Sequence, residues 1–133
     1  MPDCIFCKII QGKIPCNKVY EDKNFFAFLD KNPAKKGHIL VTPKKHCYTI
    51  LDCDDKTLKD IMPVIKKIAK KVKSISDGYN VLVNNFEAAG QVVPHLHFHI
   101  VPRFKDDADI FNRRQVKYEN NEIEEYQRKL SIK

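Results

Sequence analysis

The chain has 133 residues, a length usual for one domain, and 43% of them are hydrophobic, which is enough for a core without disulfides. No apolar run approaches the ~18 residues of a membrane span, and the N-terminus does not resemble a signal peptide, so we expect the five cysteines to be reduced thiols in the cytoplasm. The net charge is +7, so a nucleic-acid partner has to be weighed against a merely solvated basic surface.

Three short strands are predicted in the first third of the chain. Residues 17–21 and 25–30 form two strands joined by a turn, and the second is almost entirely apolar, which is typical of a strand buried on both faces. A loop follows at 32–37. Residues 37–42 form the third strand, which Pro43 ends.

One long helix is predicted from Asp55 to Ser76, because apolar residues recur there at spacings of three and four. Asp54 or Asp55 can cap its start, and Asp77 with Gly78 supplies a stop. Pro63 lies inside the pattern, so we expect a kink or a shifted start there. The predicted buried stripe is Leu58, Ile61, Met62, Ile65, Ile68, Ala69, Val72 and Ile75.

The basic residues of this helix are interpreted as its solvated face. No aromatic side chain is interleaved with them, so they lack the stacking surface of a single-strand binder, and we expect no specific nucleic-acid partner. They are Lys66, Lys67, Lys70, Lys71 and Lys73.

Two further strands are predicted at 79–84 and 95–102. Beyond residue 104 the chain turns polar, with a possible short helix around 120–130, so we divide it into a domain over 1–104 and a polar C-terminal tail over 105–133. Five strands and one long helix without βαβ alternation indicate an antiparallel α+β domain.

The most informative segment holds three histidines at alternate positions. Successive side chains of a strand point to opposite faces, so the histidines share one face and the apolar residues between them share the other. The histidines are His95, His97 and His99, and the apolar residues are Leu96, Phe98 and Ile100. The pattern permits a solvated face, a metal site built on two of the imidazoles, or nucleophilic attack on phosphorus by a neutral imidazole.

Several segments together resemble the histidine triad (HIT) family, and the likeness runs from about residue 4 to residue 104. The sequence His-Leu-His-Phe-His-Ile-Val at 95–101 resembles the signature that names the family, and the other landmarks follow in the expected order. They are 4–10, 26–30, 37–46 and 89–91. The resemblance implies a five-stranded antiparallel sheet, one long helix, a short N-terminal helix and a dimer.

The resemblance also assigns roles to single residues. His97 would be the nucleophile that forms a covalent nucleotidyl-histidine, and His99 would stabilise the charge on the phosphate. Asn84, Gly90, Gln91 and the backbone of Val92 would contact the phosphate, and Asp30 would bind both ribose hydroxyls. Phe6, Phe28 and Leu29 are candidates to sandwich the base, with ordinary core packing as the alternative.

Zinc-carrying members of the family imply a structural zinc site. Its Cys₂His₂ ligands would be Cys4, Cys7, His46 and His95. By themselves, two cysteines at this spacing could equally be redox partners or small apolar fillers. His38 is left over, and we expect it to be a buried hydrogen-bonding residue.

The implied function is hydrolysis at the α-phosphate of a purine nucleotide, with a nucleoside phosphoramidate such as AMP-amide as the favoured substrate. A diadenosine polyphosphate hydrolase is the near alternative, and a non-catalytic nucleotide-binding adaptor is the alternative of another class. The chain departs from the family pattern in two features. Val92 stands where many relatives carry serine or threonine, and the chain lacks the C-terminal tryptophan of one branch of the family.

Overall fold

The computed structural model describes residues 3–107 and 115–132. The elements are α1 (Ile5–Ile10), β1 (Lys18–Glu21), β2 (Phe25–Leu29), β3 (Ile39–Pro43), η1 (Ile50–Asp52), α2 (Asp55–Lys73), β4 (Gly78–Val83), η2 (Glu87–Ala89), β5 (Phe98–Arg103) and α3 (Glu122–Leu130). The five strands form one antiparallel sheet in the order β1-β2-β3-β5-β4. This confirms the predicted fold.

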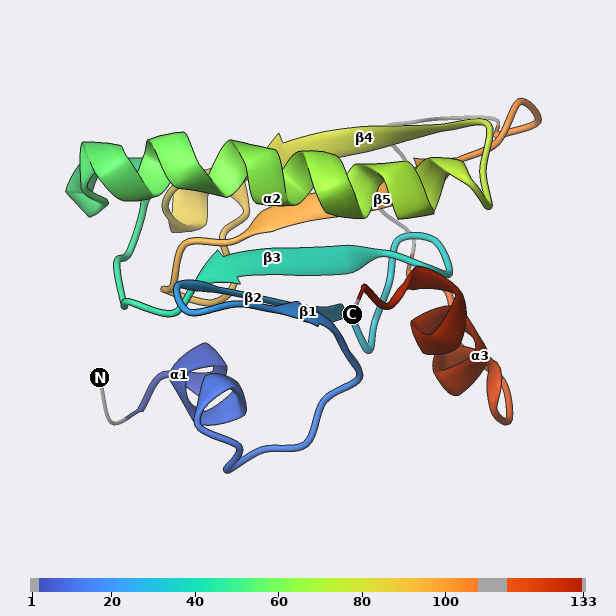
Figure 1. Ribbon diagram of the computed structural model, residues 1–133, viewed down its shortest axis with the longest axis horizontal. Helices are drawn as coiled ribbons and strands as arrows, with labels where there is room; N and C mark the ends of the chain where they lie inside the picture. The colour runs from blue at the N-terminus through green and yellow to red at the C-terminus, as the bar shows by residue number, and fades with distance from the viewer. Residues whose placement is uncertain (1–2, 108–114, 133) are drawn as a thin grey trace.

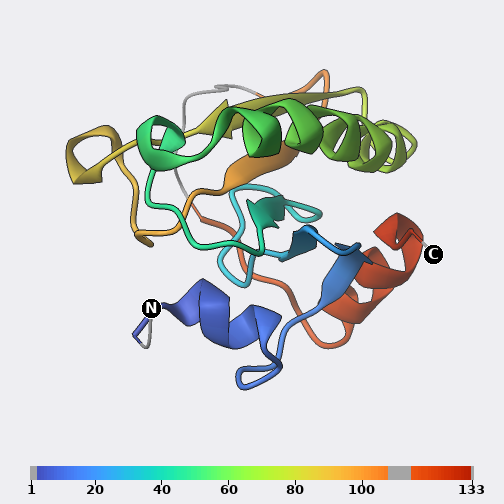
Figure 2. The same cartoon turned by 60° about the vertical axis from the view of Figure 1, so that its left-hand side comes forward.

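Helices cover both faces of the sheet (Figures 1 and 2). Strand β2 explains the two layers, because all five of its residues are buried. Ala27 and Leu29 belong to the larger core under α2, while Phe26 and Phe28 belong to a smaller core that α1 covers. Alternate side chains of β2 therefore pack into different cores, one on each face of the sheet. This is why nearly every residue of the strand is apolar.

Helix α2 begins where predicted, since the Asp54 side chain accepts the N–H of Thr57 at its N-terminus. Pro63 neither breaks the helix nor shifts its start. Its ring lies on the exposed side, and the helix is held by its buried stripe. The predicted stripe needs one correction, because Met62 is 52% exposed and Val64 is buried in its place. The helix also ends at Lys73 rather than Ser76, and the predicted stop residue Gly78 opens β4.

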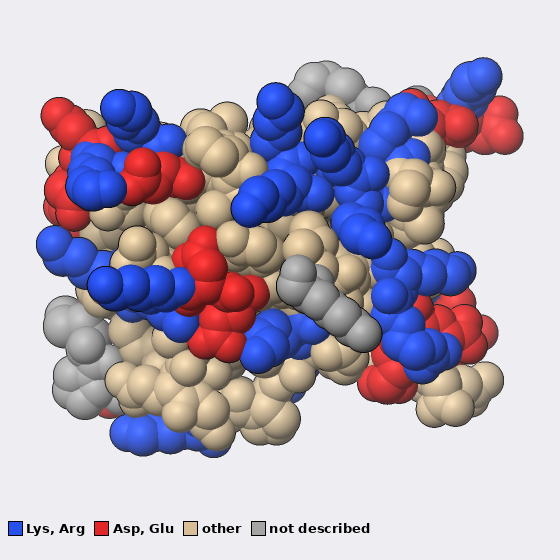
Figure 3. Space-filling model, in the orientation of Figure 1, with Lys and Arg blue, Asp and Glu red and all other residues tan. Residues whose placement is uncertain are grey.

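The lysines of α2 lie on its outer side, as predicted, and Figure 3 shows basic side chains gathered over its C-terminal half. No helix among the described residues is long and apolar enough to cross a membrane.

Strand β5 begins at Phe98, not at His95 as predicted. The segment before it is tied to the loop after β3, because Leu96 N–H donates to Cys47 O at 2.8 Å, and no ladder continues through it. The alternation of side chains survives this irregularity. Leu96, Phe98 and Ile100 all lie in the larger core.

The C-terminal segment packs onto the domain. Helix α3 lies beside the sheet next to the loop between β2 and β3 (Figure 1). Leu130 is fully buried in the larger core, and Ile132 N–H donates to Val19 O at 2.8 Å on the edge strand β1. The short helix expected around 120–130 is confirmed, whereas the division of the chain after residue 104 stays a prediction.

Candidate active site and metal centre

A cavity of about 490 Å³ lies on the α1 side of the sheet, over β3, β5 and β4. The loop after β2, the loop before β5 and the segment that begins at Gln115 complete its wall. It brings together most of the residues singled out from the sequence. These are Phe6, Asp30, His38, Asn84, Gly90, Val92, His97 and His99.

His97 is held in one tautomer by the backbone. Its Nδ1 lies 2.7 Å from the carbonyl oxygen of His95, and because a carbonyl can only accept, Nδ1 carries the proton. The Nε2 atom is then left with a lone pair. Burial lowers the pKa of His97 below its usual value, against the opposing effects of the His95 carbonyl and of Asp30. The imidazole is therefore neutral and nucleophilic at physiological pH.

The proton of His99 is set by His38, the residue immediately before β3. Ala34 N–H donates to His38 Nδ1 at 3.0 Å, so Nε2 of His38 carries a proton, which it donates to His99 Nδ1 at 2.9 Å. His99 must then carry its own proton on Nε2, a buried atom with no hydrogen-bond partner among the described residues. Burial lowers the pKa of His38 to about 4 and that of His99 to about 3. A neutral donor is thus available beside His97, whose ring centroid is 4.9 Å away.

Asp30 closes β2 at the rim of the cavity. Its Oδ1 accepts the N–H of Asn32 at 2.9 Å, and its own N–H donates to His38 O. Burial raises the pKa of this carboxyl, although the Asn32 N–H and His97 oppose the change. The second carboxylate oxygen is available to hydroxyl donors in the cavity.

The Gln91 side chain holds the loop from Asn84 to Val92 in place through hydrogen bonds to the backbone. The Gln91 Oε1 accepts Phe86 N–H at 2.7 Å, and its Nε2 donates to the carbonyls of Tyr48 and Val93. The side chain is buried and fully engaged, and the Gln91 N–H donates to Phe86 O at 3.2 Å, so the phosphate contact expected of Gln91 would require one of these bonds to open. Phe86 has a positive φ of 72° with an extended ψ of 158°, a strained backbone conformation that these hydrogen bonds stabilise.

The apolar wall differs from the one expected. Phe6 lines the cavity, with its ring perpendicular to that of His97 and 4.9 Å between the ring centroids, and Leu40 and Val93 lie beside it. Phe28 packs behind Phe6 in the smaller core, and Leu29 lies in the core on the opposite face of the sheet. Leu40 and Val93 were not identified from the sequence, although Leu40 sits on the same face of β3 as His38 and could have been.

A second cluster lies behind α1, where Cys4, Cys7, His46 and His95 place their ligand atoms within 4.8 Å of one another. Cys4 Sγ is 3.3 Å from His95 Nδ1, Cys7 Sγ is 3.5 Å from His46 Nδ1, and the two Nδ1 atoms are 3.2 Å apart. Zinc bonds of ~2.0 Å to nitrogen and ~2.3 Å to sulfur place tetrahedral ligands roughly 3.3–3.8 Å apart. The spacing and the donor set therefore fit zinc.

The orientation of His95 supports the same assignment. Its Nε2 donates to Pro43 O at 2.8 Å, which leaves the Nδ1 lone pair directed at the cluster. Burial and the neighbouring Cys4 thiol raise the pKa of Cys7, so a bound cation is what would favour its thiolate.

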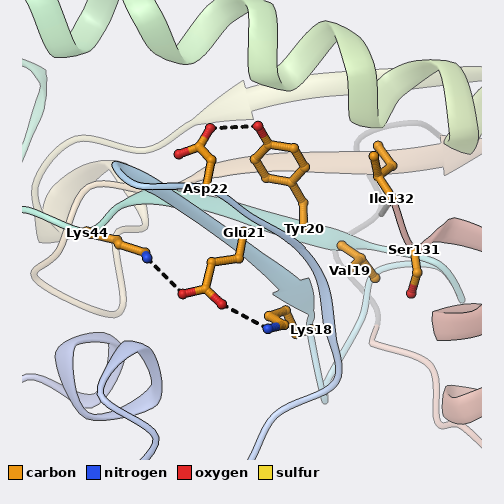
Figure 4. A pocket seen from close by; sticks show the side chains of 8 residues that line it. All are labelled: Lys18, Val19, Tyr20, Glu21, Asp22, Lys44, Ser131 and Ile132. Carbon is orange, nitrogen blue, oxygen red and sulfur yellow. Dashed lines mark hydrogen bonds and ion pairs between the residues drawn. The ribbon is translucent and has the colours of Figure 1, made fainter.

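A further hollow of about 520 Å³ runs along the outer edge of β1 (Figure 4). Its charged side chains are paired with one another, since Glu21 bridges Lys18 and Lys44, and Tyr20 donates to Asp22. Such self-satisfied pairs on an open surface indicate no ligand site.

Known proteins identify the architecture. Residues 11–106 match the HIT domain. The chain belongs to the HIT family. The adenosine 5'-monophosphoramidase hnt1 of Schizosaccharomyces pombe is 47% identical over 100 residues, which are 75% of this chain and 74% of that protein.

Solved structures of HIT proteins superpose closely. A HIT-like protein from Bartonella henselae has a TM-score of 0.88 at 39% identity and covers 98% of this chain and 95% of its own. A zinc-bound histidine triad protein from Mycobacterium smegmatis has a TM-score of 0.86 at 35% identity, covering 97% and 91%. The predicted family and fold are confirmed.

Proposed function

We propose that this HIT protein is a nucleoside phosphoramidase that hydrolyses AMP-amine substrates through a nucleotidyl-His97 intermediate. The observation that carries the proposal is the orientation of His97, whose Nδ1–H is bound by His95 O so that the Nε2 lone pair is the free nucleophile. The hnt1 relative, named as an adenosine 5'-monophosphoramidase, supports the same class of substrate.

The cavity supports a two-step reaction. His97 Nε2 attacks the α-phosphorus and an N–P bond forms. The bond to the substrate amine breaks, and the amine leaves with the electron pair of that bond and a proton from solvent water. His99 Nε2–H donates to a phosphoryl oxygen while negative charge gathers there. Water then cleaves the N–P bond, which releases AMP and returns His97 to its neutral form.

The remaining lining residues suit the other parts of a nucleotide. Asp30 would accept both ribose hydroxyls, and Asn84 with the backbone N–H of Val92 would bind phosphate oxygens. The N–H groups of Gly90 and Gln91 already donate to Glu87 O and Phe86 O, so binding through them would require this turn to open. Phe6, Leu40 and Val93 offer the apolar surface for a purine.

Steady-state hydrolysis of a fluorogenic adenosine phosphoramidate, run beside diadenosine tri- and tetraphosphate, tests this assignment. We expect kcat/KM to be at least about ten-fold higher for the phosphoramidate, because a ten-fold difference needs only ~1.4 kcal/mol of selectivity. A preference for either dinucleotide would make the protein a dinucleoside polyphosphate hydrolase. Tight AMP binding without turnover of any substrate would instead indicate an adaptor.

We further propose that Cys4, Cys7, His46 and His95 hold a structural zinc ion and that the protein works in a reducing compartment, the cytoplasm. The four ligands fit zinc in spacing and chemistry, and all five cysteines are free thiols. The bound ion would supply no chemistry to the reaction, and its ligands would tie α1 to the loop after β3 and to the segment that carries His97.

We also propose a two-fold dimer joined through β4. Among the described residues this strand pairs only with β5, so no described strand covers its outer edge. It exposes Tyr79 and Val81 on the face that α2 covers, where Met62 is also exposed. An apolar strand edge favours pairing with a second copy. Light scattering should report twice the chain mass of 15.5 kDa, and Val81→Lys should halve it. A single-chain mass for the unmodified protein would exclude this dimer.

A further inference from the structure

The loop between β2 and β3 connects two residues of the active site. Asp30 lies at its start and His38 at its end, and the Asp30 N–H donates to His38 O at 3.0 Å. Inside the loop, Asp30 Oδ1 binds Asn32 N–H and His38 Nδ1 binds Ala34 N–H. The position of the Asp30 carboxylate therefore depends on the conformation of residues 31–37.

Residues after β5 hold this loop from outside at four points. The contacts join Lys35 to Asp107 at 2.6 Å, Pro33 O to Val116 N at 2.9 Å, Gly37 N to Tyr118 Oη at 2.7 Å, and Lys36 to Glu122 at 2.8 Å. A polar segment that sequence reasoning treated as a tail thus fastens the loop that carries the proposed ribose ligand.

Of the four contacts, that of Tyr118 satisfies a buried backbone donor of the loop and can be removed by a side-chain change. The Lys36 ion pair is about one-third exposed on both sides, and exposed ion pairs contribute little. The Gly37 N–H is buried, and an unmet buried donor is costly. Gly37 cannot easily move to find another acceptor, because a Cβ there would already lie 3.2 Å from Pro102 and 3.3 Å from Tyr126.

Tyr118 is suited to act as a fixed acceptor. Burial raises the pKa of its phenol to about 12, so the group stays neutral at any working pH. Its ring packs edge-on against Tyr126 of α3, with 5.8 Å between centroids. Helix α3 is held on the domain by apolar packing, since Leu130 is fully buried and Ile123 and Tyr126 pack against the larger core. The position of the Tyr118 phenol oxygen, which accepts the Gly37 N–H, is therefore fixed relative to the sheet.

We propose that Tyr118 is a positioning residue for ribose recognition. Its phenol oxygen fixes the backbone of Gly37, which fixes the 31–37 loop and so holds the Asp30 carboxylate where the two ribose hydroxyls of a nucleotide reach it. The inference rests on the proposed function, because it assumes a nucleotide whose ribose lies at Asp30.

Calorimetry of AMP and 2',3'-dideoxy-AMP binding to the wild type and to Tyr118→Phe tests the proposal. The dideoxy compound has no ribose hydroxyls for Asp30 to bind, so its affinity measures all of the nucleotide contacts other than this one. We expect wild-type protein to prefer AMP by about ten-fold or more, and Tyr118→Phe to lose most of that preference while binding dideoxy-AMP within about two-fold of wild type.

Gln127→Ala is the matched control. It removes hydrogen bonds of the same C-terminal segment to β1 and leaves the Gly37 contact in place, so it should lower Tm while retaining the preference for AMP. Equal weakening of both ligands in Tyr118→Phe, or equal loss of preference in Gln127→Ala, would show a merely structural role and overturn the proposal.

The outcomes also separate this inference from the function on which it rests. A wild type that binds both ligands equally would refute the ribose role of Asp30, and the positioning role with it. A wild type and a Tyr118→Phe variant with the same strong preference for AMP would refute only the role of Tyr118. Hydrogen exchange gives a second measurement on the unmodified protein. AMP should slow exchange in residues 31–38 and 116–119 together, and protection of the first segment alone would contradict the proposal.

Discussion

Two clusters of close ligand atoms lie on either side of His97, and the structure makes them chemically different. The ligand atoms of Cys4, Cys7, His46 and His95 lie within 4.8 Å of one another, and so do those of Asp30, His38 and His99. In the first cluster, Pro43 takes the only ring proton of His95, so its Nδ1 lone pair meets two sulfurs and a second nitrogen. Such convergent acceptors favour a cation.

In the second cluster the two imidazoles are already joined by a hydrogen bond. Ala34 donates to His38 and His38 donates to His99, so each of these ring nitrogens has its partner. Of the ring nitrogens in this cluster, only His99 Nε2–H is left without a partner among the described residues, and it is suited to an anion such as a phosphate. The comparison teaches that proximity does not define a metal site. The distribution of protons, which backbone groups impose on the rings, decides whether a cluster binds a cation or an anion.

The largest effect should come from removing the nucleophile between the two clusters. His97→Ala should lower kcat on an adenosine phosphoramidate by up to about a million-fold, because a covalent step is lost. AMP affinity should stay within about ten-fold, since Asp30 and the loop at Gly90 are intact. A variant that kept a tenth of the wild-type rate would exclude the covalent route.

Breaking the first cluster should remove a metal and leave the chemistry in place. Protein purified without chelator should contain about one zinc per chain, and Cys4→Ser should lose it, with a fall in Tm of about 10 °C for a domain of this size. Cys16→Ser is the control, because Cys16 is a free thiol outside the cluster. Metal-free wild-type protein of unchanged stability would return Cys4 and Cys7 to the role of packing residues.

Breaking the second cluster should affect the rate and not the metal content. His38→Ala removes the donor that fixes the His99 tautomer, and we expect kcat to fall about 10- to 100-fold, the usual cost of losing such an orienting partner. His38→Gln can keep a donor near His99 and should recover part of the rate. Loss of zinc from His38→Ala would contradict the separation of the two clusters.

The smallest effect is on the pH profile. Burial holds the pKa of His97 below its usual value, and that of His99 at about 3. Because the pKa of His97 lies below 6.5, the acid limb of kcat/KM should be centred below pH 6.5, on the lowered pKa of His97, and His99 should add no titration in that range. An acid limb centred above pH 6.5 would contradict the lowered pKa of His97.

Much of this could be predicted, because it depends on periodicity. The strands, the long helix and the shared face of the three histidines follow from repeats of two and of three to four residues. The partners of those histidines could not be predicted in the same way. His38 reaches His99 because Leu40 and His99 are paired in the ladder between β3 and β5, and Gln91 closes a loop on itself. Tyr118 meets Gly37 across 81 positions of sequence, with no local pattern to show it.

The bond between Ile132 and Val19 has a consequence for the order of folding. Strand β1 and the C-terminal segment come from opposite ends of the chain, and closing so long a loop costs entropy before any contact forms. The hairpin of β1 and β2 can assemble early, but Leu130 can complete the larger core only after nearly the whole chain has been synthesised. Because the C-terminal segment also holds residues 31–37, that loop would be the last part of the active site to become rigid. It would also be the first to loosen when the native protein opens locally.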